Sequence, residues 1–243
     1  MKLRIKFKKY GAMRFIGHLD VMRFFQKAIR RAGIDVTYTS GFSPHQVMSF
    51  ASPLGVGLES NGEYMDIQVN SLPVPKEDGS EAGLTPCEIL AKRLNDASVR
   101  GLDVVTARIL PENAGNAMAS VAAASYTVRF REGREPENIP SLDAFLSKEE
   151  ILIVKETKRG KREVDIRPGI YELSWHGDAF AMLVDASSAG NVRPVQVITA
   201  LLADCGEDLK ENAMLVTRED VYTDLGTEEK RRFVSLGDIG GVL

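Results

Sequence analysis

The chain has 243 residues, of which 44% are hydrophobic and 27% charged, and its formal net charge is −3. This composition excludes a disordered or fibrous chain, and no run of about 18 apolar residues is present that could cross a bilayer. The first residues show no signal-peptide pattern, so we expect a soluble cytoplasmic protein, long enough for two domains.

The net charge conceals a strong asymmetry along the chain. Residues 1–33 contain ten Lys or Arg residues and a single acid, Asp20. This segment therefore carries +9, and the other 210 residues carry −12. Such a separation favours a polyanion-binding face on an otherwise acidic protein, although a solvated basic face without a partner would show the same pattern.

The first half of the chain follows the order β-α-β-β-α-β. Residues 2–9 alternate lysine or arginine with apolar residues, which predicts a strand with a cationic outer face. Residues 18–32 carry apolar residues at helical spacing, with Arg23, Gln26, Lys27 and Arg30 on the opposite face and Gly33 as the stop. Further strands are predicted at 35–38, 64–69 and 102–110, and a helix capped by Thr85 is predicted from Pro86 to Ala97.

The same order recurs after a predicted linker at residues 111–120. Strands are predicted at 126–131, 151–156, 171–175, 179–184 and 214–222, and helices at 141–146 and 194–203. We therefore expect an α+β protein with tandem ferredoxin-like (βαββαβ) domains and antiparallel sheets. The first domain covers residues 1–112 and includes a long loop at 39–62. The second covers residues 121–243 and includes an inserted basic arm at 158–168.

The loop at 39–62 is the segment most typical of a functional site. It holds four glycines, two prolines and five serines. A connection of this length is uncommon in a compact domain unless it has a function, and its apolar content does not fit a solvated linker.

The cationic strand predicts a surface for RNA. In a ferredoxin-like sheet the first strand is central, so its outer face would lie in the middle of an open surface with Tyr64 as the one aromatic. Phosphate contacts should then outweigh base contacts. The complete set of candidate RNA- or anion-binding residues is Lys2, Arg4, Lys6, Lys8, Arg14, His18, Ser43, His45, Ser49, Tyr64, Arg167 and Arg193.

Two histidines are the candidates for catalysis. His18 stands at a helix start, where the dipole opposes protonation, so a neutral imidazole could act as a base or a ligand. With Asp20 and His45 it would complete a sparse metal-binding set. Since Asp is a common residue in a first helical turn, we expect no metal and no cofactor. A metal-independent ribonuclease with His18 or His45 as general base is the alternative.

Several motifs resemble one bacterial family. The segments are Met13–Asp20, Arg30–Gly33, Gly41–His45 and Met48–Gly57, with Val164–Pro168 and Asn191–Pro194 as weaker markers. They resemble the radical SAM-linked proteins, a domain of unknown function found beside or fused to radical SAM proteins of the cobalamin type. The resemblance implies a radical SAM partner. Cys87 and Cys205 cannot supply a cluster-binding triad, so the chain is not itself a radical SAM enzyme.

These observations lead to one functional hypothesis and two alternatives. The hypothesis is an accessory module that binds structured RNA, such as tRNA or rRNA, and presents it to a radical SAM protein. The alternatives are the ribonuclease and a protein-interaction domain that docks the radical SAM partner. No membrane association is expected, and the sequence leaves open whether the protein catalyses a reaction.

Overall fold

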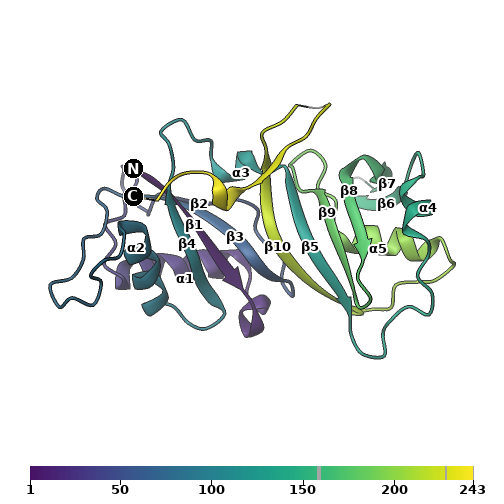
Figure 1. Cartoon of the computed structure of the whole chain (residues 1–243), viewed down its shortest axis with the longest axis horizontal. Coiled ribbons are helices and arrows are strands. Elements are labelled where there is room, and N and C mark those ends of the chain that lie inside the picture. Colours follow the sequence, from purple (N-terminus) through teal and green to yellow (C-terminus); the bar gives the residue numbers. More distant parts are fainter. Residues whose placement is uncertain (158–159, 228, 243) are drawn as a thin grey trace. The chain divides into compact units, whose positions relative to one another are not determined.

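The computed structural model describes residues 1–157, 160–227 and 229–242. It is a mixed α/β structure with a large, mostly antiparallel β-sheet and few helices (Figure 1). The chain divides into two compact units, the first made of Met1–Val121 and Asp220–Leu243 and the second of Ala122–Glu219. The sequence placed everything after residue 121 in the second domain, whereas the structure groups the last segment with the first unit.

The first unit is built around β1 (Lys2–Lys9), which pairs antiparallel with β3 (Glu59–Gln68) on one side and β4 (Leu102–Ile109) on the other. The short strand β2 (Met48–Phe50) pairs with the far edge of β3. The alternation predicted for β1 is confirmed on one face, because Leu3, Ile5 and Phe7 are buried. The central position of β1 also follows the prediction.

Two helices cover this apolar face. They are α1 (His18–Arg31) and α2 (Pro86–Asp96). Phe25 of α1 packs edge-on against Phe7 with 4.7 Å between ring centroids, and Leu90 and Leu94 of α2 belong to the same buried core. The predicted start of α2 is confirmed, since Thr85 and Glu88 form a reciprocal capping box.

The predicted strand at 35–38 and the predicted single loop at 39–62 are both corrected. Residues 35–38 make only isolated bridges, Val36 to Val69 and Tyr38 to Gln46. One stretch of a strand's edge accepts only one partner, and β2 occupies the edge of β3 at residues 65–67. The loop is therefore divided by β2 into segments 37–47 and 51–58, and β3 begins at Glu59 rather than at the predicted Tyr64.

The cationic face of β1 is not the open platform that the sequence predicts. Arg4 is only 3% exposed, and its Nε and Nη2 atoms donate to both carboxylate oxygens of Asp66 at 2.8 and 2.9 Å. Asp66 also accepts from the backbone N–H of Ala117, at the start of α3 (Ala117–Ser120). Arg4 is thus a neutralised and covered cation, because a buried guanidinium needs a carboxylate partner.

The C-terminal segment covers more of the same face (Figure 1). It comprises β11 (Phe233–Ser235) and the 3₁₀ helix η3 (Leu236–Asp238), and Leu236 is fully buried. Lys6 donates to Asp220 at 2.9 Å, and the Tyr64 hydroxyl bonds to Asp220 and to Ser235. Burial, reinforced by the bond to Asp220, raises the pKa of Tyr64 well above its usual range. Of the four predicted contacts on β1, Lys2 is exposed and Lys8 is half-buried.

The second unit has its strands in the order β10-β5-β9-β8. The elements of this unit are β5 (Ala123–Phe130), α4 (Leu142–Leu146), β8 (Ile170–Trp175), β9 (Ala179–Asp185), α5 (Pro194–Ala203) and β10 (Met214–Asp224). These elements follow the predicted pattern. The end of β10, from Asp220, belongs to the first unit, where β10 is the neighbour of β3 and β11.

The predicted basic arm at 158–168 is part of a separate hairpin. The strands β6 (Leu152–Thr157) and β7 (Gly160–Asp165) form a two-stranded sheet of their own. Lys158 and Arg159, which belong to the predicted arm, lie outside the described residues. The arm ends in the 3₁₀ helix η2 (Arg167–Gly169). Within the described ranges, no helix combines the length and the apolar character that a membrane crossing requires.

The ion pair of Arg4 yields the first prediction. Asp66→Ala should lower the free energy of unfolding by about 3 kcal/mol, because it leaves a buried charge and the Ala117 N–H without their partner. Urea denaturation measures this loss. The control is Asp96→Ala, which breaks the exposed i,i+4 pair with Lys92 and should change the stability little. Equal losses in the two variants would show that Arg4 does not depend on Asp66.

Candidate nucleic-acid interface

The solvent face of α1 carries a basic stripe. The helix buries Val21, Phe25, Ala28 and Ile29 on one side. The residues Arg23, Lys27 and Arg30 are exposed on the other side at i, i+4 and i+7. They extend over about 10 Å of the helix axis.

The ion pairs on this stripe are weak. Arg23 approaches Asp20 at 3.5 Å, with both side chains about two-thirds exposed. Arg30 donates to the carbonyl of Gln26 in its own helix at 3.3 Å. An exposed pair such as Arg23 with Asp20 contributes little, so these cations are available to an anionic ligand.

Segment 37–47 is a hairpin-like loop that we call the tip loop. The backbone N–H of Thr39 donates to His45 O at 2.9 Å, and Val47 N–H donates to Thr37 O at 2.8 Å. The hydroxyl of Thr39 accepts from His45 N–H and lies 3.1 Å from His45 Nδ1. Residues 40–45 are all exposed, and Phe42 among them is completely so. Tyr38 is 47% exposed. Exposed aromatics of this kind are the surfaces on which unpaired bases stack.

A cavity of about 160 Å³ lies between the tip loop and α1. Its lining residues are Gln26, Arg30, Tyr38, Pro44, His45 and Gln46. Gln46 is only 4% exposed, and its Nε2 atom donates to Gln26 O at 3.2 Å. Its Oε1 atom has no hydrogen-bond partner among the described residues. The cavity therefore joins the basic stripe to the aromatic loop.

The two candidate histidines do not share a cavity. His45 lies with Gln26 and Arg30, whereas His18 packs its ring edge against Phe50, with 5.0 Å between centroids. Gln26 and Arg30 are eight and twelve residues beyond His18, or about 12 and 18 Å along the helix axis. Among the described residues, no group of three or more His, Cys, Asp or Glu is placed to hold a metal ion. The structure thus separates the predicted His18, Asp20 and His45 set.

His18 belongs to a second cluster of ionisable side chains. It lines a very small cavity together with Lys9, Phe50, Leu54 and Glu63. Lys9 is 1% exposed and donates from Nζ to Ile16 O at 2.9 Å. Burial lowers the pKa of His18; the nearby Glu63 opposes this shift and Lys9 adds to it. The direction agrees with the neutral imidazole expected from the sequence.

The other predicted site residues are dispersed. Arg14 pairs with Glu59 at 3.2 Å and lies over the ring of Phe15, and Ser49 bonds to Asn116. In the second unit, Arg167 donates to the carbonyls of Leu146 and Ile170, and Arg193 is exposed at the start of α5. Of the predicted set, the tip loop brings together only Ser43 and His45.

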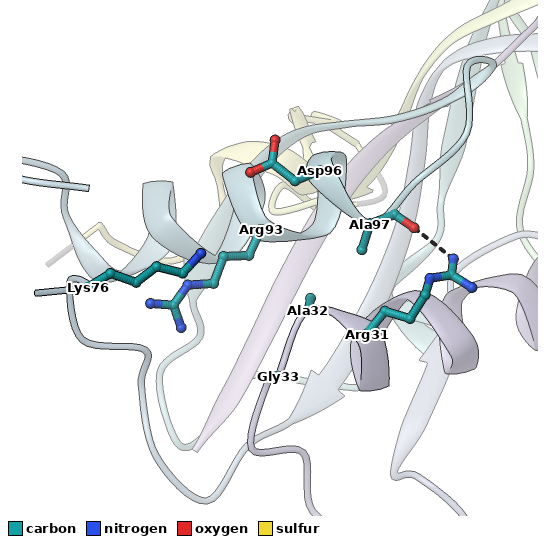
Figure 2. A pocket seen from close by; sticks show the side chains of 7 residues that line it. All are labelled: Arg31, Ala32, Gly33, Lys76, Arg93, Asp96 and Ala97. Atoms are coloured by element: carbon teal, nitrogen blue, oxygen red, sulfur yellow. Dashed lines mark hydrogen bonds between the residues drawn. The ribbon is translucent and has the colours of Figure 1, made fainter. Parts of the chain in front are cut away.

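A larger cavity near the ends of α1 and α2 is lined by three cations. Figure 2 shows Arg31, Lys76 and Arg93 around this cavity of about 540 Å³. Arg31 donates to Ala97 O at 2.7 Å, and Arg93 donates to both oxygens of Glu81 at 2.8 and 2.6 Å. Helix C-termini carry negative partial charge, which favours these cations and opposes an anion. We interpret the cavity as a helix-capping region.

Helical spacing in the sequence predicted the basic face of α1, but these residues were not among the predicted RNA-binding residues. Arg23, Lys27 and Arg30 could be recognised from helical spacing alone, whereas the cationic β1 carried the stronger local signal. Gln46 carried no signal, since a buried amide with a free acceptor can be seen only in three dimensions.

The geometry defines a mixed α/β protein with a basic helix face beside an aromatic loop. By sequence the chain belongs to the DUF2344 family, described as an uncharacterized protein conserved in bacteria, which matches residues 2–194. The matched range contains α1, the tip loop and the His18 cluster. No curated protein matches the chain.

The shifted pKa of His18 yields the second prediction. A depressed pKa means that the unfolded chain binds the proton more readily, so stability should fall as the pH decreases from about 7.5 to about 5.5. Thermal melts across this range should show a smaller decrease for His18→Gln than for the wild type. The exposed His176 provides the control, and His176→Gln should keep the wild-type dependence. An identical dependence in all three proteins would contradict the role of burial at His18.

Proposed function

We propose that this protein binds RNA through the exposed face of α1 and the tip loop. The observation that carries the proposal is the placement of Arg23, Lys27 and Arg30 beside a loop that exposes Tyr38 and Phe42. Lysine and arginine neutralise phosphates, and exposed aromatic rings stack with unpaired bases. A surface with both features suits RNA that has single-stranded loops or ends better than it suits a regular duplex.

The covering of the sheet supports this location. Arg4 and Lys6 are engaged by Asp66 and Asp220, and Leu236 is buried in the segment that covers them. Separating either cation from its carboxylate would cost more free energy than a contact with a surface phosphate would contribute. We therefore propose that RNA binds the helix face of the first unit and not the sheet face.

We also infer that the two units are ferredoxin-like domains. In each unit the first strand lies between the third and the last strand, as in β4-β1-β3 and β10-β5-β9. A helix follows the first strand and another precedes the last. The order of elements is that of the split βαβ unit.

We propose a radical SAM protein as the partner. The resemblance of residues 13–20 and 48–57 to radical SAM-linked proteins supports an accessory role, in which the bound RNA is presented to a radical SAM protein. The ribonuclease alternative, with His18 or His45 as general base, gains no support from a second histidine, because the two histidines line different cavities. If the basic stripe instead docks an acidic protein surface, the wild type should not bind RNA in the following test.

The third prediction concerns the basic stripe. The double variant Arg23→Glu/Lys27→Glu should weaken binding of a labelled RNA hairpin with a single-stranded loop about tenfold or more at low salt. It should also reduce the slope of log K against log salt by about 1.4, because two phosphate contacts are lost. Fluorescence anisotropy at several salt concentrations measures both quantities.

The matched control is Lys2→Glu/Lys8→Glu on β1, which makes the same change in net charge. This control should retain most of the affinity. Equal losses of RNA affinity in both double variants would show that the affinity depends only on the net charge of the protein. No RNA binding by the wild-type protein would remove the proposal.

A further inference from the structure

We infer that the cavity between α1 and the tip loop binds a phosphate monoester at an end of the RNA. This inference rests on the proposed RNA binding and adds the group that the surface selects. Three observations carry it: no acidic residue lines the cavity, three exposed side chains around it can donate hydrogen bonds, and its two walls are bonded to each other.

The cavity has the charge of an anion site. Arg30 and His45 line it, and none of its six lining residues is acidic. Both residues are exposed, so a ligand in the open cavity can reach them. Arg30 donates from Nε to Gln26 O at 3.3 Å, and none of the described carboxylates forms an ion pair with it. Its Nη atoms are therefore available to an anion.

The tip loop adds two neutral donors to the guanidinium of Arg30. The hydroxyl of Thr39 lies 3.1 Å from His45 Nδ1. When this hydroxyl donates to Nδ1, the neutral ring carries its hydrogen on Nε2 and can donate from there. The Tyr38 hydroxyl accepts from Gln46 Nε2 at 3.5 Å, which leaves its own hydrogen for a ligand. Hydrogen bonds to a charged phosphate are stronger than bonds between neutral groups.

The donors of the tip loop are held in place beside α1. Gln46 is 4% exposed and donates from Nε2 to Gln26 O at 3.2 Å, which bonds the loop to the helix. Tyr38 and Gln46 also form an isolated β-bridge within the loop. Because these contacts already order both walls, a ligand need not order them on binding, and less conformational entropy is lost.

The size of the cavity and the number of donors favour a monoester. Its volume of about 160 Å³ corresponds to roughly five water molecules, which suffices for a phosphate group but not for a base pair. A phosphate monoester has three unsubstituted oxygens and carries about −1.5 to −2 charges at pH 7. An internal phosphodiester has only two such oxygens and one charge. The three donors therefore match a monoester, which RNA carries only at a 5′ or 3′ end.

The basic stripe continues from the cavity toward the start of α1. Along the helix axis, Lys27 lies about 4.5 Å before Arg30, and Arg23 lies about 6 Å before Lys27. Neither Lys27 nor Arg23 lines the cavity. These two cations can neutralise the internal phosphates that follow the bound end. The cavity thus selects the end of the RNA, and the rest of the stripe adds affinity for any strand.

The first experiment uses the wild-type full chain and a short single-stranded RNA labelled at an internal base. The RNA is prepared with a 5′-phosphate, with a 3′-phosphate, or with hydroxyls at both ends. Fluorescence anisotropy should show about tenfold tighter binding of at least one phosphorylated form than of the unphosphorylated RNA, because charged hydrogen bonds are added. The two phosphorylated forms distinguish a 5′ from a 3′ monoester.

The outcomes of this experiment separate the two proposals. Equal affinity for all three forms would overturn the monoester site and leave the proposed RNA binding intact. Failure of the wild type to bind any of the three forms would overturn both.

The second experiment separates the cavity from the net charge. Arg30→Ala and Lys27→Ala each remove one cation from the same helix face, but only Arg30 lines the cavity. Arg30→Ala should reduce the affinity ratio of phosphorylated to unphosphorylated RNA to about threefold or less, whereas Lys27→Ala should weaken both RNAs and keep the ratio. Tyr38→Phe keeps the ring and loses only the hydroxyl, so it should also reduce the ratio. The same ratio in Arg30→Ala and Lys27→Ala would show that charge alone explains the preference, and would overturn the site.

Discussion

Arg4 lies in the central strand of the first unit, and both oxygens of the Asp66 carboxylate hold its guanidinium away from solvent. The same carboxylate accepts from Ala117 N–H and so attaches α3 to the outer face of the sheet. A second carboxylate, Asp220, engages Lys6 and Tyr64 beside the C-terminal segment. These pairs engage Arg4 and Lys6 and leave Lys2 as the one fully exposed cation among the four on this face of β1.

An exposed basic surface lies on the outer side of α1. An amphipathic helix that buries one stripe of apolar residues necessarily presents its opposite stripe to solvent. In α1 the presented stripe is basic, and the pair of Arg23 with Asp20 is longer and far more exposed than the pair of Arg4 with Asp66. The tip loop adds the exposed rings of Tyr38 and Phe42 next to it. Phosphate attraction and base stacking are therefore available from adjacent elements.

The His18 cluster is a different kind of site. Its lysine and glutamate are almost entirely buried, and its cavity is too small for a ligand of more than about one water molecule. The ionisable groups there influence one another's charge, as the lowered pKa of His18 shows. This cluster joins β1, the start of α1 and the segment around Leu54, so its role in this structure is to hold the motif of residues 13–20 against the sheet.

The sequence by itself determined the order of the elements and several of their ends. Helical spacing located α1 and α2, the Thr85 cap located the start of α2, and alternation identified the buried side of β1, because these signals depend on neighbours within a few residues. Only the tertiary structure decided what covers the other side of β1. The partners of Arg4 and Lys6 lie 62 and 214 positions away, and no local pattern specifies pairings over such separations. The burial of Gln46 likewise arises where the tip loop meets α1, so it is a property of packing rather than of the residue.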